Sequence, residues 1–484
     1  MSVTSADILF KKPVTINDTT TNGGVKGQVE VVSGVRHSLF PRVTKSERTA
    51  GTTKYRKEFW CNENESEDIA YGVLVWIELP SNADDRFYLT KGTQTDTQTL
   101  LTTPATGDVV LWGGCGQLHT ALSGAETSIV LDMENNDFVF NNGDYLHISN
   151  KLLVSQTIGS TVVAGDSVLL TTGTWNKITS TTDIDYPNGL YVGDNNVLTL
   201  ETTTNEEWLK IAENLTEDES IGTGDGSDTS PTLSTLTNVT KGICNVSGKT
   251  PVISTINTSD GAMTVTLNQD GTFTGDASAG ELNMTTGAWT TPIVWTSAPK
   301  LSADITCTYR EKPYSYSSNT VTVELDTGES VSNAYTVAKT FASICVYEEV
   351  VVASFDTDSW AITSAAGAYD NSNLTIHNDG AEEDTITLTF NGTTTYTASG
   401  INSGNLNSGS SLSVSTNPVI LLNPSNGKSM VTIPSAGWSG SWVSGDTIVF
   451  DTHPGAVPIW LKEVVPAATV QESNNVLALG WYCE

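Results

Sequence analysis

The sequence predicts an all-β protein made of several antiparallel domains, sandwich or barrel-like, arranged in series. Short runs rich in Thr, Val, Ile, Trp and Tyr alternate with turns of Gly, Asn, Asp and Ser, which are the residues that favour strands and their connections. Apolar residues almost nowhere recur with the period of an amphipathic helix. We therefore expect helix in under about a tenth of the chain. The 484 residues allow for roughly three to five domains.

The first unit is predicted at residues 1–145, as an N-terminal arm followed by a β domain. Residues 55–61 (YRKEFWC) and 72–79 (GVLVWIEL) flank the acidic turn NENESED, which indicates a strand, a polar turn and a second strand. The arm has no evident domain of its own, so we expect it to pack against a neighbouring subunit; folding back on its own chain is the alternative. Its apolar residues are Val3, Ile8, Leu9, Phe10, Val14 and Ile16.

Residues 146–220 are predicted as a small domain of β-hairpins, with short strands such as SVLLTT, GLYVG and VLTLE. Residues 206–214 (EEWLKIAEN) are the one place where a short helix competes with a strand. We favour a strand, because VLTLE, the turn TTTN and EEWLKIAE together have the alternation of a hairpin.

Residues 221–312 are predicted as a self-contained β-sandwich module. Asp270-Gly271 between TVTLNQ and TFTG predicts a hairpin with a type I′ turn, which needs a positive φ at two positions. The expected core contributors, on both faces of the strands, are Ile243, Met263, Val265, Phe273, Leu282, Trp289, Val294, Trp295 and Ile305.

Residues 313–352 are predicted as connecting strands and residues 353–484 as a C-terminal β-sandwich domain. The two segments KEFWCNENESEDIAYGVLVWIE and NLTIHNDGAEEDTITLTF share one plan: a strand ending in Asn, an acidic turn and an apolar strand. We interpret this echo as a reused hairpin type, which does not establish a duplication.

The charge restricts the partners of the chain. With 23 Lys and Arg against 55 Asp and Glu, the formal net charge is −32, so duplex nucleic acid and anionic membranes are disfavoured. The densest basic stretch is expected to be a solvated or inter-subunit face that pairs with the acidic remainder. It contains Arg42, Lys45, Arg48, Lys54, Arg56 and Lys57.

The sequence has no visible export signal, and it has no run of apolar residues long enough to span a membrane. Both observations favour a protein made in a reducing cytoplasm. Its six cysteines are far apart and without metal-ligand spacing, so we expect free thiols. A disulfide between Cys244 and Cys307, which lie on strands of one module, is the minor alternative. The cysteines are Cys61, Cys115, Cys244, Cys307, Cys345 and Cys483.

No pattern in the sequence predicts a catalytic residue, a cofactor or a metal site, so we expect a protein that is not an enzyme. The loop GTGDGSD lacks the alternating acids and terminal Glu of a calcium loop and is expected to be an acidic linker. Among the 12 Trp, Trp438 and Trp442 in AGWSGSW are candidates for stacking on sugars, with core packing as the alternative. Trp481 and Tyr482 in LALGWYCE are candidate interface aromatics.

Three segments resemble a family of uncharacterised virion structural proteins of tailed bacteriophages, from the tail-tip and baseplate region. The first comprises ILFKKPVTINDTTTNGG and VVSGVRHSLFPRVTKSERTAGTTKYRKEFWCNEN, which are similar to the N-terminus of that family. The second, NQDGTFTGDASAGELNMTTGAWTTPIVWTSAPKLSADITCTY, is similar to a β-sandwich module that recurs in phage tail, baseplate and fibre proteins. The third, DTIVFDTHPGAVPIWLKEVVPAA, resembles a terminal segment of the same family. The resemblance implies a structural role without enzymatic residues.

The leading hypothesis is therefore a structural and assembly component of a tailed-phage virion, in the tail tip or baseplate. A receptor- or glycan-binding adhesin on the same particle is the first alternative, and a capsid decoration protein the second. We expect assembly in the host cytoplasm, other phage tail proteins and further copies of this chain as partners, and no binding to nucleic acid and no membrane insertion. The arm and the C-terminal end are the expected contact regions.

Overall fold

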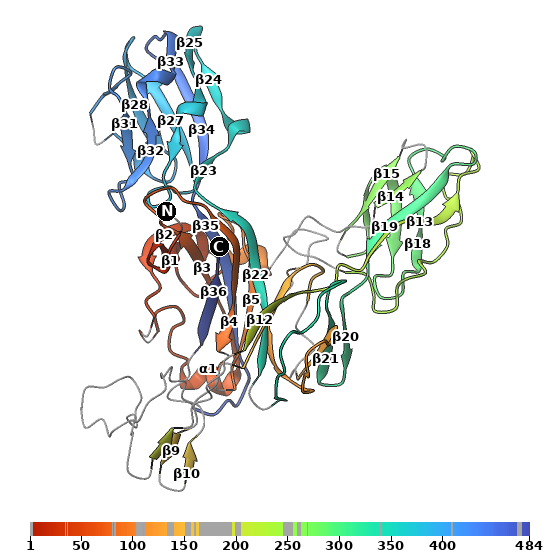
Figure 1. The fold of residues 1–484 in the computed structure, drawn as a ribbon. Coiled ribbons are helices and arrows are strands. Elements are labelled where there is room, and N and C mark those ends of the chain that lie inside the picture. The colour runs from red at the N-terminus through yellow and green to blue at the C-terminus, as the bar shows by residue number, and fades with distance from the viewer. Residues whose placement is uncertain are drawn as a thin grey trace.

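The computed structural model confirms the all-β prediction: 50% of the chain is strand and 6% is helical, and none of the sheets described closes into a barrel. Figure 1 shows a central body, an upper lobe and a side lobe. The residues that the structure describes are 3–33, 35, 37–79, 81, 84–102, 110, 112–132, 140–150, 156–158, 161–163, 196–198, 205–244, 255–258, 263–268, 270–337, 340–407, 410–471 and 477–484.

The central body is a sandwich of two antiparallel sheets around one shared core. Its smaller sheet has the order β2 (Gly23–Glu30), β1 (Ile8–Thr15), β3 (Thr52–Asn62), β35 (Ala456–Val465) and β5 (Arg86–Lys91). Trp60 and Ile459 of this sheet meet Val75 and Ile344 of the other sheet in the core, and each is at most 3% exposed. Strands from opposite ends of the chain, β3 and β35, thus pair in the middle of the smaller sheet.

The large sheet of the central body is organised around its long strand β22 (Phe341–Val351). The order is β12 (Glu206–Lys210), β8 (Tyr145–Ser149), β22, β6 (Cys115–Leu118), β7 (Ser128–Asp132), β21 (Thr320–Glu324) and β20 (Tyr314–Ser317). The strand β4 (Ala70–Leu79) also pairs with β22, and β36 (Ala478–Tyr482) pairs with β4. Two short α-helices, α1 (Lys45–Ala50) and α2 (Gln98–Thr102), and the 3-10 turn η1 (Ser5–Asp7) complete the described part of this body.

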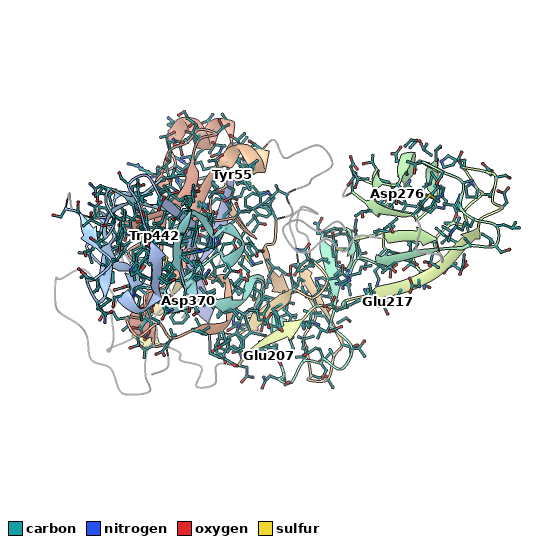
Figure 2. The ribbon with its side chains drawn as sticks, turned by 90° about the horizontal axis from the view of Figure 1, so that it is seen from above. Tyr55, Glu207, Glu217, Asp276, Asp370 and Trp442 are labelled. Atoms are coloured by element: carbon teal, nitrogen blue, oxygen red, sulfur yellow. The ribbon has the colours of Figure 1, made fainter. Side chains whose placement is uncertain are left out.

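The side lobe is a sandwich with its own core. Its larger sheet consists of β13 (Leu215–Thr223), β19 (Asp304–Arg310), β14 (Thr255–Thr258), β15 (Thr264–Leu267) and β16 (Phe273–Gly275), and a second sheet of β17 (Ala277–Leu282) and β18 (Trp289–Trp295). Figure 2 shows this lobe, with Asp276 and Glu217 labelled, standing apart from the rest of the molecule. The prediction of a self-contained sandwich core is confirmed, except that Ile293 takes the buried place expected for Val294.

The upper lobe contains three sheets around a core of its own. The first consists of β23 (Ser354–Phe355), β24 (Ala361–Thr363), β34 (Thr447–His453), β27 (Asp384–Phe390), β28 (Thr395–Gly400), β29 (Gly404–Asn405) and β30 (Leu412–Ser413). The second contains β26 (Thr375–Ile376), β32 (Ser429–Ile433) and β31 (Val419–Leu422), and the third β25 (Ala366–Tyr369) and β33 (Trp438–Ser441). The 3-10 turns η3 (Thr357–Ser359), η4 (Asn371–Asn373) and η5 (Ser435–Gly437) connect them.

The strands group differently from the predicted boundaries. The predicted connecting strands at residues 313–352 belong to the large sheet of the central body, as β20, β21 and β22. The last two strands of the predicted unit 353–484, β35 and β36, complete the two sheets of the central body. Within 146–220, β12 pairs with β8, whereas β9 (Gln156–Ile158), β10 (Thr161–Val163) and β11 (Asn196–Leu198) form a small sheet. The end of that predicted domain belongs to the side lobe, because β13 begins at Leu215. Residues 151–155, 159–160, 164–195 and 199–204 lie outside the described residues.

Both ends of the chain pair within the same chain, which is the alternative to the arm that was expected. The β1 strand pairs with β3, matching Phe10 with Trp60, and β36 pairs with β4, matching Trp481 with Val75. The N-terminal arm therefore packs in a sheet of its own chain, because β1 pairs with β3 and β3 pairs with β35 from the far end of the sequence. Val14 and Ile16 of the arm remain exposed, at 62% and 45%.

Two hairpin predictions are correct in their strands and wrong in detail. The Asp270-Gly271 hairpin forms between β15 and β16, but only Gly271 has a positive φ (+91°) among its described residues. The Gly271 N–H donates to the Asn268 carbonyl, and the turn is the longer form that ends in one left-handed glycine. The strand expected at residues 206–214 is found at residues 206–210, but its partner is β8 and not VLTLE.

The echo between residues 57–78 and 373–390 is not a hairpin. The strands β3 and β4 belong to different sheets of the central body, and β26 and β27 belong to different sheets of the upper lobe. Both acidic turns therefore cross from one sheet of a sandwich to the other. The two turns also contact each other, because Glu67 of the first accepts from the Asn378 N–H of the second at 2.6 Å.

The upper lobe joins the central body through two connections, after β22 and before β35, held by buried amides. The Asn378 side chain accepts from the Ala353 N–H at 2.7 Å and donates to the Asp68 carbonyl at 3.2 Å. His377 Nδ1 lies 2.6 Å from Glu67 Oε1. Gln28 Nε2 donates to Glu382 Oε1 at 2.9 Å, and Lys428 pairs with the exposed Glu65.

The side lobe also has two connections, after β12 and before β20, and is held mainly by ion pairs. The buried Asn142 amide donates to the carbonyls of Ala212, Glu213 and Glu311 at 2.8–3.1 Å, so it holds both connections at once. The ion pairs around it are Arg310 with Glu213, Lys210 with Glu213 and Asp326, and Lys241 with Glu324. A cleft of about 620 Å³ lies at this junction.

Half of the predicted basic face is buried and paired within the chain. Lys54, Arg56 and Lys57 are 6%, 4% and 0% exposed. Their partners are Glu47 at 2.9 Å, Asp18 at 2.5 Å and Asp96 at 2.6 Å. Burial lowers the pKa of Lys57, and the nearby Asp96 carboxylate opposes that shift. All six cysteines are free, so the minor alternative of a Cys244–Cys307 disulfide is not found.

Candidate functional site

The candidate site is the outer face of the large sheet, where aromatic side chains from five strands gather. On β22, Ile344 and Val346 enter the central core, so the alternating Cys345 and Tyr347 lie on the other face. The same alternation holds on β4, β8, β12 and β36. We call the resulting set the aromatic face: Trp76, Tyr145, His147, Trp208, Tyr347 and Tyr482.

The rings of the aromatic face contact one another. Trp76 stacks on His147 with 4.3 Å between ring centroids. Trp208 lies 5.4 Å from His147 and 5.0 Å from Tyr482. Tyr145 and Tyr347 form a second contact at 5.1 Å. Centroid separations in this range are the favourable ones for aromatic pairs, so the rings support one another's positions.

The aromatic face has an inner and an outer layer. Trp76 and His147 are buried, at 3% and 2% exposed. Tyr482 is 37% exposed, and Trp208, Tyr145 and Tyr347 are partly exposed. A rigid inner layer thus supports rings that reach the surface of the molecule, which is the arrangement that binding surfaces use.

Three carboxylates border the aromatic face, and each contacts one of its rings. Trp76 Nε1 donates to Glu78 Oε2 at 2.6 Å, His147 Nε2 lies 3.5 Å from Glu206 Oε2, and the Tyr482 hydroxyl donates to Glu484 Oε1 at 3.3 Å. Electron-rich rings beside carboxylates attract cations. The face therefore suits a cationic or neutral group and repels an anionic one.

Two hydroxyls and one thiol of the aromatic face keep their neutral forms near neutral pH, because their pKa values are raised. Burial raises the pKa of the Tyr347 hydroxyl, and burial together with the neighbouring Glu484 raises that of Tyr482. Burial also raises the pKa of the Cys345 thiol well above its ordinary value, so that this cysteine is an inert part of the inner layer. The described residues of the face therefore provide stacking surfaces and hydrogen-bond donors.

Trp438 and Trp442, the predicted sugar-stacking pair, lie in the core of the upper lobe. Trp442 is 3% exposed and stacks on Phe390 with a centroid distance of 4.2 Å and an interplanar angle of 4°. Trp438 is partly buried and lies 4.5 Å from the Tyr369 ring. A Cβ on Gly367 would meet the Trp442 ring at 2.4 Å, so the strand passes directly over this indole. Figure 2 shows Trp442 among the strands of the lobe.

Trp481 and Tyr482, the predicted interface pair, point to opposite faces of the large sheet. The Trp481 ring packs edge-on against Trp60 of the central core, with 6.0 Å between centroids. Tyr482 lies on the aromatic face beside Trp208. Because neighbouring residues of a strand point to opposite faces, the pair could not form one surface. The structure therefore assigns Trp481 to the core and leaves Tyr482 as the exposed member.

Sequence reasoning missed Trp208, Tyr145 and Tyr347. Their strands have large apolar residues at consecutive positions, as in YLHIS and WLK, where a strand with one wet face would alternate. That pattern shows that both faces of these strands carry apolar groups, and it was the available signal. The sequence does not show that five strands from distant parts of the chain meet in one sheet.

The calcium-like loop is an acid-capped turn. Asp225 accepts from the Ser227 and Asp228 N–H groups at 2.8 and 2.7 Å, and these hydrogen bonds lower the pKa of its carboxyl. No group of three or more His, Cys, Asp or Glu within the described residues could hold a metal ion. In the same part of the chain, no helix is long and apolar enough to cross a membrane.

No known protein family, curated protein or solved structure matches this chain.

Proposed function

We propose that this chain is a structural and assembly component of a tailed-bacteriophage particle, in the tail tip or baseplate. The observation that carries the proposal is the attachment of the two lobes. Each lobe is joined to the central body by two connections. The buried Asn142 amide hydrogen-bonds to both connections of the side lobe, and the buried Asn378 amide to the first connection of the upper lobe and to the Asp68 carbonyl of the central body. A lobe with two covalent connections and a buried, hydrogen-bonded amide beside them keeps its orientation relative to the central body. A rigid body with several lobes suits a building block of a particle.

The aromatic face adds a surface through which such a block can contact a neighbour. Interface cores are enriched in Tyr and Trp, and exposed aromatic rings on a rigid sheet bind with little loss of conformational entropy. The same rings can stack on sugars, and the carboxylates beside them can accept hydrogen bonds from sugar hydroxyl groups. This supports the alternative of an adhesin. Trp208 and Tyr482 replace Trp438 and Trp442 as the candidates for that role.

Immunogold labelling tests the proposal. Antibodies raised against the purified chain are applied to intact particles of the phage that encodes it, and we expect label at the tail tip or baseplate. Mass spectrometry of the same particles checks that the chain is present. Label over the head shell would favour a decoration protein, and absence of the chain from purified particles would overturn the proposal.

A further inference from the structure

We infer that the chain binds a second copy of itself, with the basic segment around α1 of one copy docked on the aromatic face of the next. This inference rests on the proposed function only in that a building block must contact its neighbours. It names the partner and both surfaces: Arg42, Lys45 and Arg48 on one side, and the aromatic face with its border of carboxylates on the other.

The donor surface is a positive spot on a chain whose net charge is −32. Arg42 and Lys45 are exposed and Arg48 is partly exposed, and none has an ion-pair partner among the described residues. The acid of the same segment, Glu47, is occupied by Lys54 at 2.9 Å and by the Thr44 N–H at 2.6 Å. These contacts lower the pKa of Glu47 to about 2 and hold the first turn of α1.

The acceptor surface complements that spot in charge and in chemistry. Guanidinium and ammonium groups bind over the faces of Trp and Tyr rings and pair with adjacent carboxylates. The aromatic face offers both, because Trp208 and Tyr482 reach the surface and Glu206 and Glu484 border them. The side chain of Glu206 is 34% exposed, so it is accessible to an incoming cation.

The two surfaces lie on different parts of the central body. Figure 1 shows α1 at its lower end, below β4, and the C-terminus higher on the same body. A contact between unlike surfaces is head-to-tail and continues from copy to copy, giving a ring or a filament. The general repulsion between chains of −32 charge disfavours other arrangements, so that low salt should strengthen this contact selectively.

Sedimentation velocity of the purified full chain, at low and high salt, tests the inference. We expect association that increases with concentration and weakens at high salt. The triple change Arg42→Glu, Lys45→Glu and Arg48→Glu should weaken association by about a hundredfold, and Tyr482→Ser by about tenfold. The basic residues and Tyr482 lie at the surface, so these variants should fold, which circular dichroism checks. The matched control is Lys12→Glu with Lys312→Glu, two bases that also lack an ion-pair partner among the described residues.

A charge exchange makes the test specific. A second variant, Glu206→Lys with Glu484→Lys, should also fail to associate alone, and its mixture with the triple variant should associate, because each then offers the other a surface of opposite charge. A chain that stays monomeric at every salt concentration, or whose association survives the triple change, overturns the inference. A monomer whose binding to host cells falls with Tyr482→Ser would instead identify a receptor site. These measurements need no particle, so they can fail while immunogold labelling still finds the chain in the tail.

Discussion

The side lobe and the upper lobe are attached in the same way but held by different chemistry. Each has two connections to the central body and a buried amide beside them, Asn142 for the side lobe and Asn378 for the upper lobe. Around Asn142 stand lysine and arginine paired with carboxylates. Around Asn378 stands the His377–Glu67 pair, whose charge depends on pH near neutrality.

The difference indicates that the two lobes respond to different conditions. Lysine, arginine and carboxylates keep their charges from about pH 5 to 9, so the side junction should be sensitive to salt but not to pH. The upper junction contains a histidine whose pKa is raised, first by its hydrogen bond to Glu67. We therefore expect the upper junction to respond to changes in pH.

The largest expected effect is the loss of a lobe core, which tests whether the lobes unfold as separate units. Trp295 is 2% exposed in the core of the side lobe, and Trp295→Ala should destabilise that lobe by about 3–5 kcal/mol. The partly buried Trp289 is the matched control, and its loss should cost less. Calorimetry should show one transition moving and the others unchanged. A uniform shift of all transitions would show that the lobe is not independent.

The second-largest loss of stability is expected from removing the buried amides at the two junctions. Asn142→Ala leaves three connection carbonyls without their donor, and Asn378→Ala leaves the Ala353 N–H without its acceptor. Each change should cost about 1–3 kcal/mol, in the transition of its own lobe. Hydrogen exchange at residues 212–214 and 352–355 measures the local loosening. Equal loosening of both junctions by either variant would contradict the comparison.

The sequence predicts the lobes better than the body that joins them. The side lobe is one continuous stretch of chain with short strands and turns, so most of its core could be identified from alternation, although its first strand begins at Leu215, before the predicted boundary at residue 221. The central body takes β35 and β36 from the end of the chain and β1 from its beginning, and such long-range pairing leaves no local signal. The same reason separates Trp481 from Tyr482 and hides Trp208, because a site made from five strands depends on the register of all five.

The pH dependence of the upper junction is the third prediction. The pKa of His377 is raised in the folded protein, so its protonated form is the one that the junction stabilises. That stabilisation is fully present below about pH 6.5, the ordinary histidine pKa, and is lost as the pH rises through the raised value. The rate of hydrogen exchange at residues 352–355 should therefore rise from pH 6 to pH 9 by more than the intrinsic, base-catalysed increase. The rate at residues 212–214 should rise only by that intrinsic increase.

The control for that measurement is His377→Gln, which keeps a hydrogen-bond donor for Glu67 but cannot become charged. His453 also has a raised pKa, because of its bond to Glu383 within the upper lobe, and it remains in this variant. The part of the pH dependence that disappears with His377→Gln belongs to the contact between the lobes. An unchanged pH profile would assign the effect to His453 and remove the difference between the junctions.

The smallest expected effect compares one lysine from each junction. Lys428 is 48% exposed and its partner across the junction, Glu65, is 75% exposed, so that pair gains little in water. Its other partner, Asp379 at 3.2 Å, belongs to the upper lobe itself, and Lys428→Met should cost about 0.5 kcal/mol. Lys241 is 23% exposed, pairs with Glu324 and lies 3.9 Å from Glu311, so Lys241→Met should cost about 1 kcal/mol and leave less of the salt dependence of the side lobe. Calorimetric transitions at 50 and 500 mM salt measure both values. If the Lys428 variant were the more damaging of the two, the ion pairs would hold the upper lobe, and the division of the two junctions by their chemistry would be wrong.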